Sequence, residues 1–133
     1  LERAMAGAKA AGAKRALPLA VSIAAHSPLM DSIQGEWNAA VDACTMQAAE
    51  IPVVGNVHAQ ALRTADELRA DIKAQMQSRV RWTESVLVGM SGSGIQAYVE
   101  AGSGEVLIGM VKRIDAAASR FALGNPADFE ALI

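Results

Sequence analysis

The stretch Ala24-Ala-His-Ser-Pro-Leu-Met30 separates two unlike parts of the sequence. The segment before it alternates apolar residues with the period of a β-strand, and Ser27-Pro28 has the residue types that begin a helix, a capping serine and a first-turn proline. His26 lies between the two predicted elements. A histidine in such a turn is more often a surface or capping residue than a catalyst. Its role therefore has to be inferred from other parts of the sequence.

The composition is typical of one globular domain. The 133 residues are 52% hydrophobic, 20% charged and 4% aromatic, so a core would consist mainly of Ala, Val, Ile, Leu and Met. The net charge of -2 gives no positive field that would attract nucleic acid or an anionic membrane. We therefore expect neither as a partner.

The number of cysteines and the length of the apolar runs indicate the cellular compartment. Cys44 is the single cysteine, so no intrachain disulfide is expected. No apolar run approaches the roughly 20 residues of a membrane span, and the first residues lack a signal-peptide layout, which favours the cytoplasm. Because the sequence begins mid-helix at Leu1 without a capping residue, we interpret it as a piece of a longer protein.

The apolar periodicity predicts alternating helices and strands. Helices are expected at residues 1–11, 28–48, 64–76, 83–90 and 105–118 and after Pro126, and strands at 13–23, 51–54 and 95–99. Thr64 and Glu67 have capping-box spacing, and Thr83 could cap the next helix. The alternation indicates an α/β fold with helices on a mostly parallel sheet, and an all-α fold is the alternative.

Several short motifs could carry chemistry but have simpler structural interpretations. Residues 102–104, Gly-Ser-Gly, could hold a phosphate, yet they lack the rest of a P-loop or dinucleotide motif and are interpreted as a turn. Residues 91–94, Ser-Gly-Ser-Gly, lack the first glycine of a nucleophile elbow. Cys44 lies on the apolar stripe of its predicted helix, so a buried, inert thiol is expected. Arg79 and Arg81 are expected in a solvated loop.

A metal site is not expected either. The candidate metal ligands are His26, His58 and Asp31. Their spacing is irregular and matches no known ligand pattern. Composition and spacing therefore leave a histidine without a nucleophile.

A set of short blocks spread along the chain follows the order of a known family. They are residues 13–22, His26-Ser-Pro-Leu-Met30, Pro52-Val-Val-Gly-Asn-Val57, Val80-Arg-Trp-Thr-Glu-Ser-Val86, residues 99–107 and Lys112-Arg-Ile114. In order and approximate spacing they resemble the malonyl-CoA:acyl carrier protein transacylases. Each block alone is weakly specific, but together they cover nearly the whole chain.

The resemblance implies an α/β-hydrolase-like acyltransferase core with an inserted ferredoxin-like subdomain. Residues 1–20 would be the last helix and strand of the insert, and residues 21–133 the C-terminal part of the core. The family's serine nucleophile, in a Gly-His-Ser-Leu-Gly motif, and its malonyl-binding arginine have no counterpart in this sequence. The resemblance therefore implies the missing N-terminal part of the same enzyme as a partner.

The resemblance also implies a mechanism. In the family a serine takes the acyl group from coenzyme A and passes it to the phosphopantetheine thiol of acyl carrier protein, by a ping-pong route. His26 matches the general base. Gln75, seven residues before Trp82, falls where the family orients that histidine with a backbone carbonyl, so its side-chain type is expected to matter little. Asn56 matches a substrate-binding position near the active site.

These matches lead to one expected function and two alternatives. The expected function is malonyl transfer in fatty-acid synthesis, with malonyl-CoA and phosphopantetheinylated acyl carrier protein as substrates and no further cofactor. Ala25 stands where related acyltransferases often carry phenylalanine, which leaves malonyl specificity open. The alternatives are an acyltransferase domain of a polyketide synthase, or a non-catalytic truncated module that binds carrier protein or pairs with a separate N-terminal piece.

Overall fold

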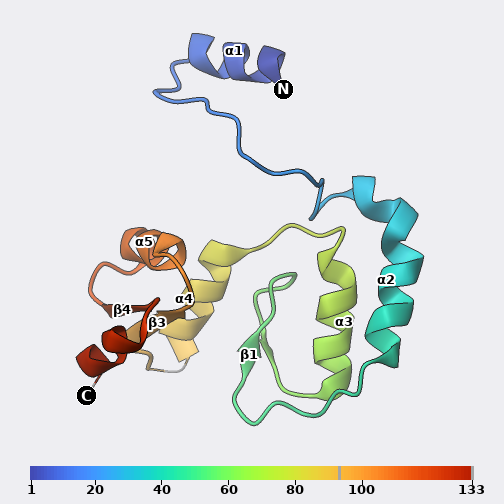
Figure 1. Ribbon diagram of the computed structural model, residues 1–133, viewed down its shortest axis with the longest axis vertical. Helices are drawn as coiled ribbons and strands as arrows, with labels where there is room; N and C mark the ends of the chain where they lie inside the picture. The colour runs from blue at the N-terminus through green and yellow to red at the C-terminus, as the bar shows by residue number, and fades with distance from the viewer. Residues whose placement is uncertain (93, 133) are drawn as a thin grey trace.

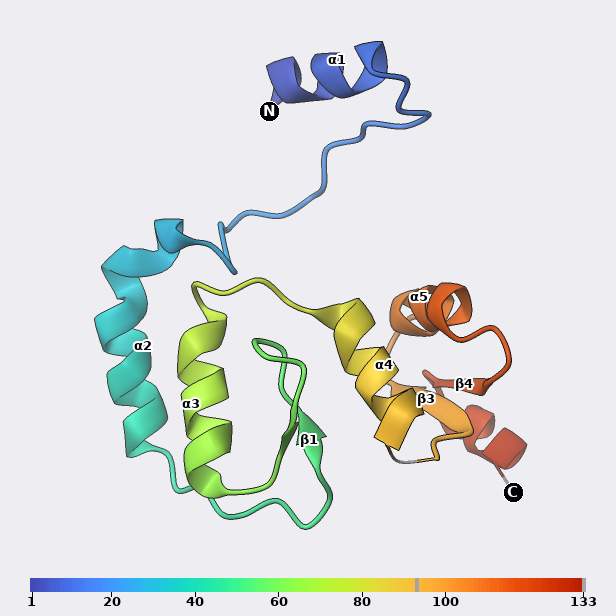
Figure 2. The same ribbon diagram turned by 180° about the vertical axis from the view of Figure 1, so that it is seen from behind.

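The computed structural model describes residues 1–92 and 94–132, and its fold is mixed α/β, as predicted (Figure 1). In chain order the elements are α1 (Glu2–Ala10), the short 3-10 helix η1 (Pro28–Met30), α2 (Asp31–Ala43), β1 (Val53–Val54), β2 (Ala61–Leu62), α3 (Ala65–Gln75), α4 (Trp82–Gly92), β3 (Ala97–Ala101), α5 (Val106–Ile114), β4 (Ser119–Leu123) and the 3-10 helix η2 (Pro126–Leu132). Both views show two lobes, one from η1 to α3 and one from α4 to η2 (Figures 1 and 2).

The segment before His26 is not a strand, contrary to the prediction. Helix α1 forms as expected, but it has no buried residue and lies apart from both lobes (Figure 2). Residues 13–23 run on without strand pairing and expose their apolar side chains, Leu17, Leu19, Val21 and Ile23. An alternating pattern forms a strand only when a neighbour satisfies its N–H and C=O groups, and no described strand lies beside this segment.

The first lobe is built on the packing of α2 against α3. Ser27 caps η1 by accepting the Leu29 N–H at 3.3 Å, with Pro28 at the first position, as the sequence predicts. Trp37 Nε1 donates to the Ile72 carbonyl across the helix pair at 3.0 Å. Thr64 and Glu67 form the predicted capping box of α3.

Helix α2 ends at Ala43, five residues short of the predicted end near Ala48. The Arg69 guanidinium of α3 donates to the carbonyls of Val41 and Cys44, the latter at 3.2 Å. It thereby satisfies carbonyls that a helix end leaves without intrahelical partners. Cys44 itself has an extended backbone.

The strands form two small sheets instead of one mostly parallel sheet. Strands β1 and β2 pair antiparallel in the first lobe, and β3 and β4 pair parallel in the second. Residues 51–54 are not the predicted buried strand, since Ile51 is 79% exposed and β1 is only two residues long.

The second lobe contains the predicted strand, glycine turn and helix. Helix α5 connects the parallel strands β3 and β4, and it is shorter than predicted. The buried apolar side chains of this lobe include Val86, Val111, Ala118 and Leu123. Thr83 is not the cap of α4, because the helix begins one residue earlier, at Trp82.

Candidate functional site

His26 is held at the C-terminal end of α3. Its backbone N–H donates to the Met76 carbonyl at 2.9 Å, and its ring Nδ1 lies 2.9 Å from the backbone oxygen of Gln75, the last residue of the helix. Carbonyls in the last turn of a helix lack intrahelical partners and are free to accept such bonds. The end of α3 therefore fixes both the main chain and the ring of His26.

This contact defines the tautomer of the imidazole. A carbonyl oxygen can only accept, so Nδ1 must carry the proton and the neutral ring keeps its lone pair on Nε2. The His26 side chain is exposed, and Nε2 can therefore meet a substrate or a residue of another segment. An oriented imidazole with a free Nε2 lone pair has the features of a general base.

The backbone of His26 is in the left-handed region, with φ at 64°. That conformation costs a non-glycine residue about 1 kcal/mol, and histidine is among the residues that adopt it more often. The preceding turn is closed by Ser27 Oγ, which donates to the Ala24 carbonyl at 2.8 Å. The turn and the two bonds to α3 together hold the strained residue in place, an arrangement typical of functional sites.

Asn56 and Gln75 are joined through their side chains. Asn56 lies in the turn after β1, and its Nδ2 donates to Gln75 Oε1 at 3.1 Å. Its backbone carbonyl accepts the Arg81 N–H at 3.0 Å. The structure thus links His26, Gln75 and Asn56 in one hydrogen-bonded set. Their catalytic and substrate-binding roles stay predictions, and the Gln75 side chain has more partners than the sequence suggested.

Asp71 belongs to the same network and was missed by the sequence analysis. It is 7% exposed, and its carboxylate accepts the Val57 N–H at 3.1 Å, the Asn56 N–H at 3.3 Å and Gln75 Nε2 at 3.2 Å. Its spacing of four residues before Gln75 places both on one face of α3. That spacing is visible in the sequence, but the burial of the carboxylate is not.

The residues considered as metal ligands do not come together. Asp31 accepts a hydrogen bond from Gln77 Nε2, and His58 is exposed. Among residues 1–92 and 94–132, no group of three or more histidine, cysteine or acidic side chains is placed to hold a metal ion.

Arg79 and Arg81 share one carboxylate. Each lies 3.2 Å from Glu84 Oε1, and the Arg79 side chain is 76% exposed, in keeping with the expected solvated loop. A hydrogen bond from its own backbone N–H lowers the pKa of Glu84; burial opposes this, and the hydrogen bond and charge of Arg81 lower the pKa further. The two arginines therefore already have a carboxylate partner within the chain.

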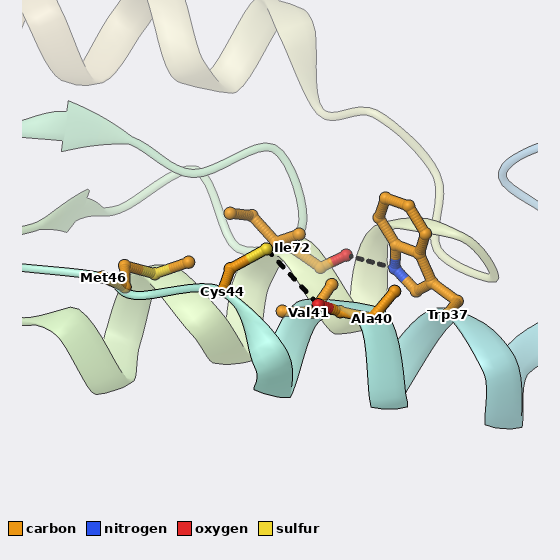
Figure 3. A pocket seen from close by; sticks show the side chains of 6 residues that line it. All are labelled: Trp37, Ala40, Val41, Cys44, Met46 and Ile72. Carbon is orange, nitrogen blue, oxygen red and sulfur yellow. Dashed lines mark hydrogen bonds between the residues drawn. The ribbon is translucent and has the colours of Figure 1, made fainter.

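Cys44 is exposed, contrary to the prediction. Because α2 ends at Ala43, the thiol stands just beyond the helix, where Sγ donates to the Ala40 carbonyl at 3.3 Å. It lines an apolar pocket of about 190 Å³, shown in Figure 3 with Trp37, Ala40, Val41, Met46 and Ile72. These neighbours include no acid or base that would activate the thiol.

The glycine motif at residues 102–104 is a turn, as interpreted. Gly102 and Gly104 have φ values of 136° and 116°, a region that favours glycine. Glu100 Oε2 accepts the Ile108 N–H at 2.8 Å in the first turn of α5, so a carboxylate already occupies the position a phosphate would need. In the other motif, Ser93 lies outside the described residues.

No helix in the described part of the chain is both long and apolar enough to cross a membrane.

Comparison with known proteins gives consistent matches along the whole chain. Malonyl CoA-acyl carrier protein transacylase of Escherichia coli (strain K12) is 38% identical over 133 residues, 100% of this chain and 43% of that protein. The enzyme of the same name from Bacillus subtilis (strain 168) is 34% identical over 126 residues, covering 95% of this chain and 39% of the relative. The chain thus spans about two-fifths of the length of these relatives. No protein-family model matches it.

Solved structures give the same picture. One matching structure is a complex of a type II polyketide-synthase acyl-carrier protein with its malonyl-transacylase. The match has a TM-score of 0.90 and 36% sequence identity, and it covers 98% of this chain and 42% of that chain. A malonyl-CoA:acyl carrier protein transacylase from Xanthomonas oryzae pv. oryzae matches with a TM-score of 0.89 and 34% identity, over 98% of this chain and 41% of that one. The predicted resemblance is therefore confirmed.

Proposed function

We propose that this chain, similar along its whole length to the malonyl CoA-acyl carrier protein transacylase of Escherichia coli, is the C-terminal portion of such an enzyme and supplies its general base. The enzyme would move a malonyl group from coenzyme A to the phosphopantetheine thiol of acyl carrier protein. The observation that carries the proposal is the 2.9 Å contact between His26 Nδ1 and the Gln75 carbonyl, which leaves Nε2 free to act as the base.

The proposed reaction has two matching halves. In the first, His26 Nε2 removes the proton of a serine outside this chain as its oxygen attacks the malonyl thioester; the acyl-enzyme forms, and the departing coenzyme A thiolate takes the proton from the imidazolium. In the second, His26 deprotonates the carrier-protein thiol, the thiolate attacks the serine ester, and the serine oxygen regains the proton. Neither half involves oxidation or reduction, so the proposal includes no redox cofactor.

The Gln75 carbonyl contributes in both halves. It holds the ring with Nε2 directed away from α3, and it accepts from Nδ1–H when the ring becomes positively charged. A hydrogen bond to a charged group is worth about 1.5 to 3 kcal/mol, more than one to the neutral ring. The transition state that creates the imidazolium is therefore stabilised more than the ground state.

We also propose a division of the chain into two domains and a set of binding partners. The separation of α1 from both lobes (Figure 2) supports a boundary near residue 20, with residues 1–20 in a ferredoxin-like subdomain and 21–133 in the acyltransferase core. Partners would be acyl carrier protein, a coenzyme A thioester and the N-terminal part of the enzyme, in the cytoplasm. A polyketide carrier protein is the second candidate, supported by the match to a malonyl-transacylase solved with a type II polyketide-synthase acyl-carrier protein, at a TM-score of 0.90.

The proposed function is tested in the parent polypeptide that joins this chain to its serine-bearing segment. Replacing His26 with alanine should lower malonyl transfer to acyl carrier protein about 100-fold or more, in the range that general bases contribute. The matched control is His58→Ala, which changes the other histidine, an exposed residue, and should stay within about twofold. Normal turnover in His26→Ala would contradict the proposal.

The non-catalytic alternative rests on the absence of the Gly-His-Ser-Leu-Gly motif from the sequence. It concerns the 133-residue chain by itself. After incubation with malonyl-CoA, intact-mass measurement of the isolated chain should show no stoichiometric malonyl adduct, since His26 has no activated serine beside it. A stable one-to-one adduct would show that this chain carries its own nucleophile.

A further inference from the structure

We propose that Asp71 is a positioning residue for His26, acting through Gln75. The inference rests on the proposed function for its catalytic meaning, while the hydrogen-bonded path itself is given by the structure. It starts at the buried Asp71 carboxylate, passes through the Gln75 side chain in the last turn of α3, and ends at the Gln75 carbonyl that holds the ring of His26.

Asp71 lies on a helix, yet its carboxylate is buried and accepts hydrogen bonds through both oxygens. Its side chain is buried, and its two oxygens accept three N–H groups, from Asn56, Val57 and Gln75. A buried carboxylate is costly unless it is hydrogen-bonded, and bonds to an ionised acceptor are about twice as strong as neutral ones. The carboxylate therefore fastens the 55–57 turn to α3 firmly.

Gly55 allows this close approach. A Cβ placed at Gly55 would lie 2.6 Å from Asp71 Oδ1 and 2.9 Å from Asp71 Cγ, distances that side-chain carbons do not tolerate. Glycine is thus needed here because the carboxylate packs directly against the backbone of the turn. The packing and the three hydrogen bonds are independent observations, and both place Asp71 at the centre of the junction.

The link to His26 runs through the last turn of α3. The Gln75 side chain is held on one side by Asp71 Oδ2 and on the other by Asn56 Nδ2. Terminal turns of helices fray when nothing restrains them. With its side chain fixed at both ends, Gln75 keeps its carbonyl aimed at Nδ1. Loosening Asp71 should let that carbonyl move and release the ring.

The test uses the 15N chemical shifts of the histidine rings in the parent polypeptide, which distinguish the Nδ1–H from the Nε2–H tautomer. This chain contributes two histidines to it, and exposed His58 serves as the internal reference. Asp71→Asn keeps the shape but leaves at least one of the three part-buried N–H groups without an acceptor. We expect the ratio of Nδ1–H to Nε2–H at His26 to fall roughly threefold to tenfold, with His58 unchanged.

The matched control is Asp115→Asn in the second lobe. Asp115 is also buried and also accepts two backbone N–H groups, those of Ala117 and Ala118 at 3.2 and 3.1 Å. Both N–H groups bond to Asp115 Oδ1, an oxygen that asparagine keeps, so this variant removes a buried carboxylate from the other lobe and should leave the His26 tautomer unchanged. Equal tautomer ratios in wild type and Asp71→Asn, or an equal change in Asp115→Asn, would overturn the proposal.

A double variant separates action through Gln75 from a general loosening of the lobe. In a Gln75→Ala background, where the side-chain link is gone, Asp71→Asn should add no further change in the tautomer ratio. Additive changes would contradict action through Gln75. Because the readout is the ring tautomer and not turnover, failure of this proposal and failure of the proposed function are distinguishable.

Discussion

His26 combines an unfavourable backbone conformation with a fixed side chain. Its φ of 64° is maintained by the bonds that its N–H and Nδ1 make to the end of α3. The resemblance carried by all the blocks together singled out this histidine, and the position of Gln75 seven residues before Trp82 identified its partner. Asp71 could not be found in the same way, because its importance lies in burial against Gly55, and the sequence does not show which residues of a turn approach a helix.

The strain at His26 can be measured by comparing two substitutions. His26→Ala and His26→Gly both remove the ring, but glycine adopts positive φ without the penalty that alanine incurs. We expect the glycine variant to have the larger free energy of unfolding, by about 1 kcal/mol. Urea denaturation of both variants gives the comparison. Equal stability, or a more stable alanine variant, would show that the residue is not strained.

At the scale of elements, the sequence predicted helices better than strands. Helix signals are local: Ser27-Pro28 and the Thr64–Glu67 pair begin η1 and α3 as predicted. A strand needs a partner, and the segments 13–23 and 51–54 lack the extended pairing that their apolar patterns suggested. The end of α2 was also missed, because it depends on Arg69 reaching across from α3.

The capping box of α3 should contribute measurably to stability. Thr64 Oγ1 accepts the Glu67 N–H at 3.2 Å, so Thr64→Ala leaves that donor without its partner. We expect a loss of about 1 kcal/mol in the free energy of unfolding, with Thr64→Ser close to wild type. Thermal and denaturant unfolding check this. An alanine variant as stable as the serine variant would count against the capping role.

The same box predicts a pH dependence at the start of α3. Hydrogen bonds from the backbone N–H groups of Thr64 and Arg63, the largest effects, lower the pKa of Glu67 from its ordinary value of 4.5. A lowered folded-state pKa gives stability that is present above the unfolded value and lost as pH falls through the folded value. Unfolding free energy should therefore decline below about pH 4.5, and Glu67→Gln should reduce that decline. An unchanged pH profile in Glu67→Gln would contradict this.

At the scale of the whole molecule, the chain exposes apolar side chains that a complete core would cover. Leu19 is 82% exposed, Ile51 79% and Val106 71%, and the chain spans 43% of a relative it matches along its full length. Large exposed apolar side chains mark interaction surfaces or lead to aggregation where they lie together.

The isolated chain should therefore associate with itself and bind an apolar dye. We expect concentration-dependent species in size-exclusion chromatography and strong 1-anilinonaphthalene-8-sulfonate fluorescence, both reduced when the N-terminal segment of the enzyme is co-expressed. A monodisperse chain with no dye binding, unaffected by that segment, would show that these side chains do not form an interface.

We propose that His26 Nε2 removes the proton of the attacking serine. The most direct test of this proposal is the rate of malonyl-enzyme formation in a single turnover of the parent polypeptide, followed by rapid quenching and intact mass. We predict that His26→Ala slows this step about 100-fold or more, while His58→Ala leaves it within about twofold. Malonyl-enzyme formation at the wild-type rate in His26→Ala would contradict the account.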